Sequence, residues 1–395
     1  MKRILSYLLL FTLTACIYPY TPDVAVKVDD TILVVSGELL AGQESLVTLS
    51  KVSPLGTTAY ETVMNKVEGV VTLVGRKGGE VCMGTRTSNG QYALNMENLD
   101  PLDEYKLRVA YAGNVYETPF MGILPAPVIT ALDYTVDDEN LNLRISLDGG
   151  DSLSDFLWNY NETWEYHAMF VPDLMYVPDQ NTEDPSIIYR KPEPEEDYYY
   201  CWTSRDGAEP CLATTAGQSE NRIKDLVFRS VPRSDPRVSV LYSISVTARG
   251  LSPDGRAYLE YLDRTSNITG DLFTPVPSNI GGNMRCVTDT TRTVIGFMEL
   301  SQSVFKRIFV SYAGVYDNIE NPYYYLYYPS YDESAGLYHF DTLYWYGDAP
   351  VFLHSKSVPP VPTTDNVEWA PRRCTDCRVS GGTKNKPEWW PNQHK

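Results

Sequence analysis

The chain has 395 residues, 43% of them hydrophobic, and a formal net charge of −18 at pH 7. This hydrophobic content supports packed cores and excludes wholesale disorder, while the length leaves room for two or three domains. The negative charge repels nucleic acid and anionic lipid headgroups, so we expect neither as a partner. The 30 tyrosines and 27 prolines favour strands and turns over helix bundles.

Residues 1–15 have the layout of a secretory signal peptide. A positive start precedes a mostly apolar run over residues 4–13, which is shorter than the ~20 residues of a transmembrane helix. The stretch LTAC, which ends at Cys16, resembles the lipobox of bacterial lipoproteins, where cleavage precedes a cysteine that carries diacylglycerol. We therefore expect Cys16 to be lipidated, and residues 16–30 to form a short tether. The alternative is an ordinary signal peptide with a chance cysteine.

Residues 31–124 are predicted to form an N-terminal β-sandwich module. Short runs of β-branched and apolar residues, such as SLVTLS (45–50) and VEGVVTLVG (67–75), are separated by turn residues. Asn89-Gly90 is a tight-turn signal. The order of turns and alternating strands that follows is similar to small sandwich modules of the transthyretin-like type.

Residues 125–354 are predicted to form a second β-sandwich module with loop insertions, and the two modules are expected to be of transthyretin-like or immunoglobulin-like type. Strands are expected at 141–150, 156–170, 239–250, 293–300 and 304–312, and the proline- and acid-rich stretch 172–197 is expected to be a loop. Ser252-Pro253-Asp254 is typical of a helix start, so one short helix is expected from Pro253 to about Ser266.

Residues 355–395 are predicted to be an extended tail that a cysteine attaches to the domain. The predicted fold class is therefore mainly β, with two sandwich modules, one helix and this tail.

Six cysteines besides Cys16 are available for disulfides in an exported chain. They allow fifteen pairings, and the sequence does not choose among them. Cys374 and Cys377 form a C-x-x-C, which we interpret first as a structural bridge, with free or separately paired thiols and a metal or redox site as alternatives. The residues considered for disulfides are Cys201, Cys211, Cys374 and Cys377.

No familiar catalytic or metal-binding pattern stands out. The four histidines show no ligand spacing, and neither a G-x-S-x-G nor a Walker A sequence occurs. Glu162 and Glu165 could pose as an acid–base pair, but three positions apart on a strand they face opposite ways, so we expect solvated or edge charges. We therefore predict a protein that is not an enzyme and that has no metal and no cofactor other than its lipid.

Three aromatic clusters, YYYCW (198–202), NPYYYLYYP (321–329) and LYWYG (343–347), are the strongest candidates for a ligand or partner surface. Tyrosine and tryptophan supply a large rigid contact area with a polar handle. The alternative is that these rings pack in the core and cover a sheet edge. The residues proposed for the surface are Tyr199, Trp202, Tyr324, Tyr327 and Trp345.

Several stretches in order, among them ILVVSGEL, WNYNETWEY, LYSISVTARGLSPDGRAYLEYL and CTDCRVSGGTKNKPEWW, resemble a family of Bacteroidota outer-membrane lipoproteins defined by a domain of unknown function, DUF 4249. The resemblance implies an exported lipoprotein that is often encoded near a TonB-dependent transporter, and it implies no reaction. We therefore expect a lipid-anchored outer-membrane protein, on the periplasmic or the cell-surface face, that assists such a transporter in uptake or assembly. The alternative is a stand-alone glycan- or peptide-binding lipoprotein.

Overall fold

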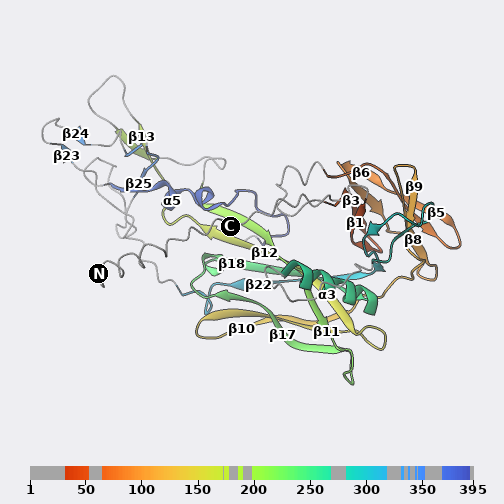
Figure 1. The fold of residues 1–395 in the computed structure, drawn as a ribbon. Coiled ribbons are helices and arrows are strands. Elements are labelled where there is room, and N and C mark those ends of the chain that lie inside the picture. Colours follow the sequence, from red (N-terminus) through yellow and green to blue (C-terminus); the bar gives the residue numbers. More distant parts are fainter. Residues whose placement is uncertain are drawn as a thin grey trace, which may run out of the picture.

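The computed structural model describes residues 32–52, 65–171, 173–177, 186–189, 198–267, 282–317, 331–332, 337–338, 343–344, 346–351 and 367–391. The predicted signal peptide, Cys16 and the tether lie outside the described residues. The fold is mainly β, as predicted, and consists of two β-sandwich modules followed by a smaller C-terminal part (Figure 1). Among the described helices, none combines the length and the apolar composition needed to cross a bilayer.

The N-terminal module packs two five-stranded sheets around one core. In order of pairing, the first sheet contains β20 (Val294–Ile295), β1 (Leu33–Gly37), β3 (Glu44–Lys51), β7 (Gln91–Asn95) and β6 (Thr85–Ser88). The second contains β19 (Arg285–Cys286), β9 (Asn114–Glu117), β8 (Tyr105–Tyr111), β4 (Val70–Gly75) and β5 (Gly79–Met83). Alternate residues such as Val47 and Leu49 of β3, and Leu107 and Val109 of β8, are buried between the sheets. The period-two pattern therefore gave the correct inward face.

The boundary predicted between the modules is wrong for residues 284–301, which complete the N-terminal module. β20 pairs in parallel with β1, β19 pairs with β9, and β21 (Leu300–Ser301) pairs with β2 (Leu39–Leu40). Met284, Met298 and Leu300 lie in the core of this module. A strand of two residues is too short to show a hydrophobic periodicity. The sequence of residues 293–300 therefore did not indicate which sheet this stretch joins.

The second module packs a three-stranded sheet against a larger one. The smaller sheet contains β10 (Val128–Val136), β11 (Asn140–Asp148) and β17 (Arg222–Pro232). The larger contains, in order of pairing, β15 (Tyr200–Asp206), β12 (Asp155–His167), β18 (Leu241–Leu251) and β22 (Ser303–Ser311), and β16 (Cys211–Thr214) also pairs with β12. Phe156 and Trp158 of β12 and Val246 of β18 fill the core between the two sheets, together with Ile145 and Leu147 of β11.

The inner face of this sandwich also buries a charged cluster. Glu162 of β12 accepts hydrogen bonds from Arg229 of β17 at 3.2 Å and from Arg237 at 3.0 Å, and the Tyr242 hydroxyl donates to it at 2.7 Å. Arg237 lies in η2 (Pro236–Val238), so the cluster joins both sheets and this connection. Burial, and then the neighbouring Glu162 carboxylate, raise the pKa of Tyr242 well above its ordinary value.

Helix α3 (Pro253–Asn267) confirms the predicted helix. The Gly255 N–H donates to the Ser252 hydroxyl at 3.0 Å, as expected for an N-cap. Ser252 in turn donates through its hydroxyl to Glu299, which belongs to the segment that completes the N-terminal module. Arg256 forms an ion pair with the buried Asp155 of β12 at 2.9 Å. The helix is therefore attached to both modules, and it lies near their junction (Figure 1).

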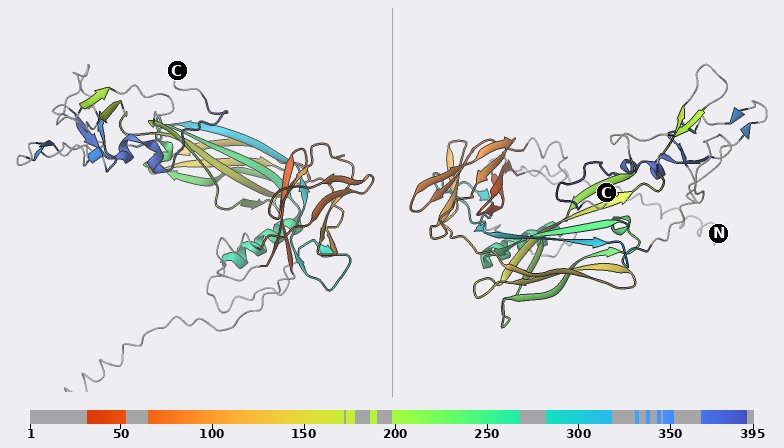
Figure 2. Two further views of the ribbon diagram at one scale, coloured as in Figure 1. Left: turned by 90° about the horizontal axis from the view of Figure 1, so that it is seen from above. Right: turned by 180° about the vertical axis from the view of Figure 1, so that it is seen from behind.

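The C-terminal part lies at the end of the second module opposite the N-terminal module (Figure 2). It consists of short elements: β13 (Leu174–Val177), β14 (Ser186–Tyr189), β23 (Tyr331–Asp332), β24 (Leu337–Tyr338), β25 (Ala349–Val351), β26 (Glu368–Ala370), α5 (Arg372–Thr375) and η4 (Cys377–Ser380). β13 and β14 form a hairpin inside the predicted loop 172–197, and its inner face packs on Trp369. The predicted tail 355–395 likewise contains β26, α5 and η4, so both stretches are more structured than their composition indicates.

Candidate functional site

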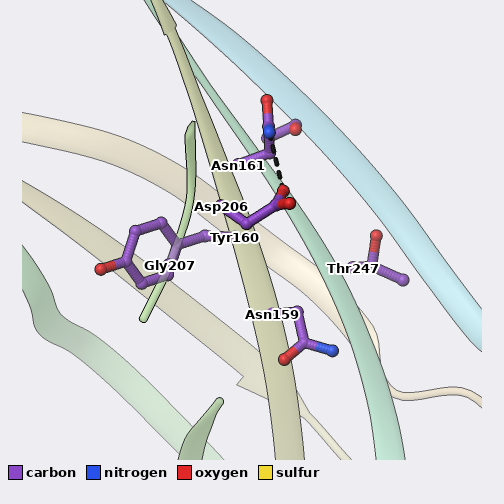
Figure 3. A pocket seen from close by; sticks show the side chains of 7 residues that line it. Asn159, Tyr160, Asn161, Asp206, Gly207 and Thr247 are labelled. Atoms are coloured by element: carbon purple, nitrogen blue, oxygen red, sulfur yellow. Dashed lines mark hydrogen bonds between the residues drawn. The ribbon is translucent and has the colours of Figure 1, made fainter. Parts of the chain in front are cut away.

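A pocket lies on the larger sheet of the second module, where the strand beside β12 is interrupted. β15 ends at Asp206, opposite Asn161 of β12, and β16 begins at Cys211, opposite Trp158. Between these points β12 faces the connection 207–210 in place of a strand. The pocket has a volume of about 320 Å³. Figure 3 shows the side chains that line it. We call it the β12 notch; it is lined by Asn159, Tyr160, Asn161, Asp206, Gly207, Ser245 and Thr247.

The polar groups of the notch are held by hydrogen bonds. The Asn161 side-chain N–H donates to Asp206 at 2.8 Å (Figure 3), and the Thr163 hydroxyl donates to the Asn161 carbonyl oxygen at 3.0 Å. The Gly207 N–H donates to the backbone carbonyl of Tyr160 at 2.8 Å. A Cβ at position 207 would lie 2.7 Å from the Tyr160 ring, so a residue with a side chain there would have to displace that ring. Hydrogen bonds and the absence of a side chain at Gly207 therefore fix the interruption of the sheet. The interruption leaves the Asn161 amide and the Asp206 carboxylate facing solvent.

The outer face of the same sheet continues from the notch into an aromatic surface. The strand register places Phe305 of β22 beside Thr247 of β18, which is opposite Asn159 of β12. Phe305 is 57% exposed. One row further along, the Arg307 guanidinium lies 3.4 Å from the centre of the Trp389 ring, and Trp389 is 40% exposed. The exposed rings of this surface, which we call the aromatic wall, are Phe305, Phe309 and Trp389.

Trp389 belongs to a C-terminal segment, residues 383–391, that lies across the far half of this face. Thr383 pairs with Trp202 of β15 through two backbone hydrogen bonds of 2.8 and 2.9 Å. The buried Trp390 indole N–H donates to Glu165 at 2.8 Å, and the other oxygen of Glu165 is 2.9 Å from a ring nitrogen of His167. Glu162 and Glu165 thus face opposite sides of β12, as predicted. The prediction that they are solvated or edge charges is wrong, because each is buried against partners from distant segments.

The disulfide in the described residues joins Cys201 of β15 to Cys377 of η4, so the predicted bridge within the C-x-x-C is wrong. Cys374 is a buried thiol that packs with Phe170, whereas Cys377 packs against β15 in a separate cluster. Cys211 is a half-buried thiol whose pKa is raised by burial. The metal or redox alternative has no support in the geometry, and no group of three or more metal-ligating side chains occurs within the described residues.

The predicted aromatic surface is not confirmed. Trp202 is 8% exposed and packs with Leu241 and Trp390, so it is part of a small core and not of an exposed surface. Tyr199 is half-buried beside His167. The remaining predicted surface residues, Tyr324, Tyr327 and Trp345, lie outside the described residues.

Sequence reasoning missed the notch and the aromatic wall. One signal was available: on β12 the polar residues Asn159, Asn161 and Thr163 alternate with Trp158 and Tyr160. A polar outer face is, however, ordinary for a sandwich strand. The notch itself depends on where β15 stops, and that is a matter of register between strands about 45 residues apart.

The β12 notch and the aromatic wall together offer hydrogen-bond donors, hydrogen-bond acceptors and exposed rings. Amides, hydroxyls and an exposed carboxylate can bind a polar molecule, and the exposed rings can pack on its apolar parts. The notch therefore offers groups that can bind a polar ligand.

Comparisons with known proteins agree with the resemblance noted in the sequence. The family described as a domain of unknown function, DUF4249, matches residues 17–307. No curated protein matches the chain. Among solved structures, a segment of two fibronectin type III domains from chicken tenascin is similar: it is 14% identical, and the match covers 54% of this chain and 88% of that segment, with a TM-score of 0.16. At that TM-score the likeness supports no conclusion about function.

Proposed function

The chain belongs to the DUF4249 family, and from that premise we propose that it is a lipid-anchored lipoprotein of the bacterial outer membrane that binds a ligand or partner without converting it. In this proposal it is an accessory of a TonB-dependent transporter, in nutrient uptake or in assembly of the transport complex. Cys16 carries the lipid, and the described modules act outside the bilayer.

The anchor is supported by the sequence before the modules. The apolar run over residues 4–13 is followed by LTAC, and a diacylglycerol thioether with an additional acyl chain is enough for stable attachment. A net charge of −18 disfavours adsorption to anionic lipid headgroups, so the attachment depends on the covalent lipid and not on the protein surface.

The binding role is supported by one observation above the others, the β12 notch. Its amide and carboxylate are fixed by hydrogen bonds before any ligand arrives, which lowers the ordering cost of binding. The exposed aromatic wall beside it adds contact area of the kind that is enriched at interfaces. These groups support capture of a ligand or partner.

The experiment is co-purification of the native, lipidated protein from outer membranes of a Bacteroidota host. We expect a TonB-dependent transporter to be enriched with the wild-type chain, and expect the enrichment to be lost with Cys16→Ala because that variant lacks the lipid. A Cys82→Ala variant, which removes a partly buried thiol from the N-terminal module and leaves the anchor intact, is the matched control. Recovery of no outer-membrane protein above a mock purification would contradict the accessory role.

A second candidate function, a stand-alone glycan- or peptide-binding lipoprotein, is favoured by the exposed rings Phe305 and Trp389. It differs from the first in needing no transporter for its activity. Ligand binding by the purified chain, together with the absence of a transporter in the native pull-down, would favour it.

A further inference from the structure

We propose that the β12 notch and Phe305 together bind a neutral carbohydrate, with sugar hydroxyls in the notch and an apolar sugar face on the phenyl ring. This inference rests on the proposed binding function and gives the chemical class of its ligand.

The polar groups suit hydroxyls, which donate and accept at the same time. Asp206 accepts from Asn161 through one carboxylate oxygen and is an exposed side chain, so its other oxygen can accept from a hydroxyl. The exposed Asn159 amide and the Thr247 hydroxyl each offer a donor and an acceptor. Adjacent hydroxyls of a sugar ring present the same combination of donors and acceptors to a protein.

The aromatic group lies at a suitable separation. Asn159, Thr247 and Phe305 are paired neighbours across β12, β18 and β22. Because neighbouring strands are about 4.8 Å apart, Asn159 and Phe305 are separated by roughly 10 Å along the sheet. One or two sugar rings fill such a distance, and the C–H face of a ring can pack on an exposed phenyl group.

A peptide is a poorer fit, because peptides that bind sheets pair with an unoccupied strand edge. β18 is internal, and the opening beside β12 spans only Asn159 and Tyr160. This opening is too short for an added strand, and the Tyr160 carbonyl already accepts from the Gly207 N–H. The sheet ends at β22, and a strand added at that edge would not use the notch. An anionic sugar is disfavoured by the Asp206 carboxylate and by the net charge of the chain. A largely apolar ligand would leave the amides of the notch without hydrogen-bond partners.

The test uses the full-length lipidated protein in detergent. It is screened on an array of neutral gluco-, manno-, galacto- and xylo-oligosaccharides of four to six residues, and the best binder is titrated by calorimetry. We expect Asn159→Ala and Phe305→Ala each to weaken binding of that oligosaccharide about tenfold, equivalent to about 1.4 kcal/mol. Both side chains are exposed, so the variants are expected to keep the wild-type circular dichroism spectrum and melting temperature.

Matched controls come from the opposite sheet of the same module. Tyr134→Ala removes an exposed ring from β10 and Asn140→Ala removes an amide from β11, and neither is expected to change the affinity. The proposal is overturned if no neutral oligosaccharide binds at millimolar concentration, or if binding is unchanged in the Asn159→Ala/Phe305→Ala double variant. It is also overturned if a peptide or an anionic glycan is the ligand whose binding that double variant abolishes. Failure of this test leaves the transporter pull-down unaffected, so the two proposals fail separately.

Discussion

Replacement of Glu162 by glutamine tests whether the buried charged cluster holds the two sheets of the second module together. The substitution keeps the shape of the side chain and removes its charge. Glu162 is 3% exposed at the side chain, and it is the shared acceptor of Arg229, Arg237 and Tyr242. In the variant, two guanidinium groups face a neutral amide whose own N–H₂ group can donate but not accept.

The expected loss follows from the exposure of the partners. Removal of one member of a buried ion pair costs about 3–5 kcal/mol, because the remaining charge is left uncompensated. Arg237 keeps its ion pair with Asp235 at 2.7 Å. Arg229 and Arg237 are also 29% and 16% exposed, so water can partly solvate them, and we expect the lower end of the range. The free energy of unfolding of the second module should therefore fall by about 3 kcal/mol.

The assay is urea denaturation followed by tryptophan fluorescence, which reports on all seven tryptophans, among them Trp158 and Trp164 of β12. The matched control is Asp133→Asn, which removes the exposed partner of Arg144 on β10 and β11, and for which a change of about 0–1 kcal/mol is expected. A Glu162→Gln loss no larger than that of Asp133→Asn would refute the reasoning, because the cluster would then contribute no more than a surface pair.

Three further predictions concern the C-terminal part and the pH dependence of stability. Trp390→Ala removes a buried ring and the indole donor to Glu165, so hydrogen exchange of residues 383–391 should quicken, with a local loss of about 3–5 kcal/mol; unchanged exchange rates there would contradict the attachment. Cys201→Ser opens a bridge between residues 176 apart, and should lower the free energy of unfolding by about 2–5 kcal/mol, while Cys211→Ser should have little effect. Burial acts to raise the pKa of Glu117, but hydrogen bonds from Lys106 and Arg108 outweigh it and hold the pKa below its ordinary value. The stabilisation by Glu117 is therefore complete above the unfolded value of about 4.3 and is lost as the pH falls through the folded value, and Glu117→Gln should flatten this acid-side loss in urea titrations.

The local features of the fold could be predicted from the sequence because they depend on neighbouring residues. The alternation of Val47 and Leu49 gave the buried face of β3, and Ser252 before Pro253 gave the start of α3. The opposite orientations of Glu162 and Glu165 followed from their spacing on a strand alone.

The predictions that were wrong concern residues whose partners lie far along the chain. Glu162 is buried because Arg229 and Arg237, 67 and 75 residues later, neutralise it, and no local pattern encodes that pairing. Trp202 is buried because the segment that carries Trp390 returns to cover it. The pairing of Cys201 with Cys377 likewise requires the position of η4 beside β15.

The candidate site was missed for a related reason. Its amide and carboxylate come from β12 and β15, and the interruption that exposes them is set by inter-strand register. The exposure of Phe305 is a property of the assembled sheet, since each face of β22 carries apolar residues and one basic residue, so its sequence does not show which face is buried.

The most direct measurement for the proposed location and role is mass spectrometry of the amino terminus of the native protein. We expect a mature chain that begins at Cys16 and carries the mass of a diacylglycerol thioether and an N-linked acyl chain. A chain that retains residues 1–15, or one cleaved elsewhere with an unmodified Cys16 thiol, would contradict the lipid anchor and with it the proposed place of this protein beside an outer-membrane transporter.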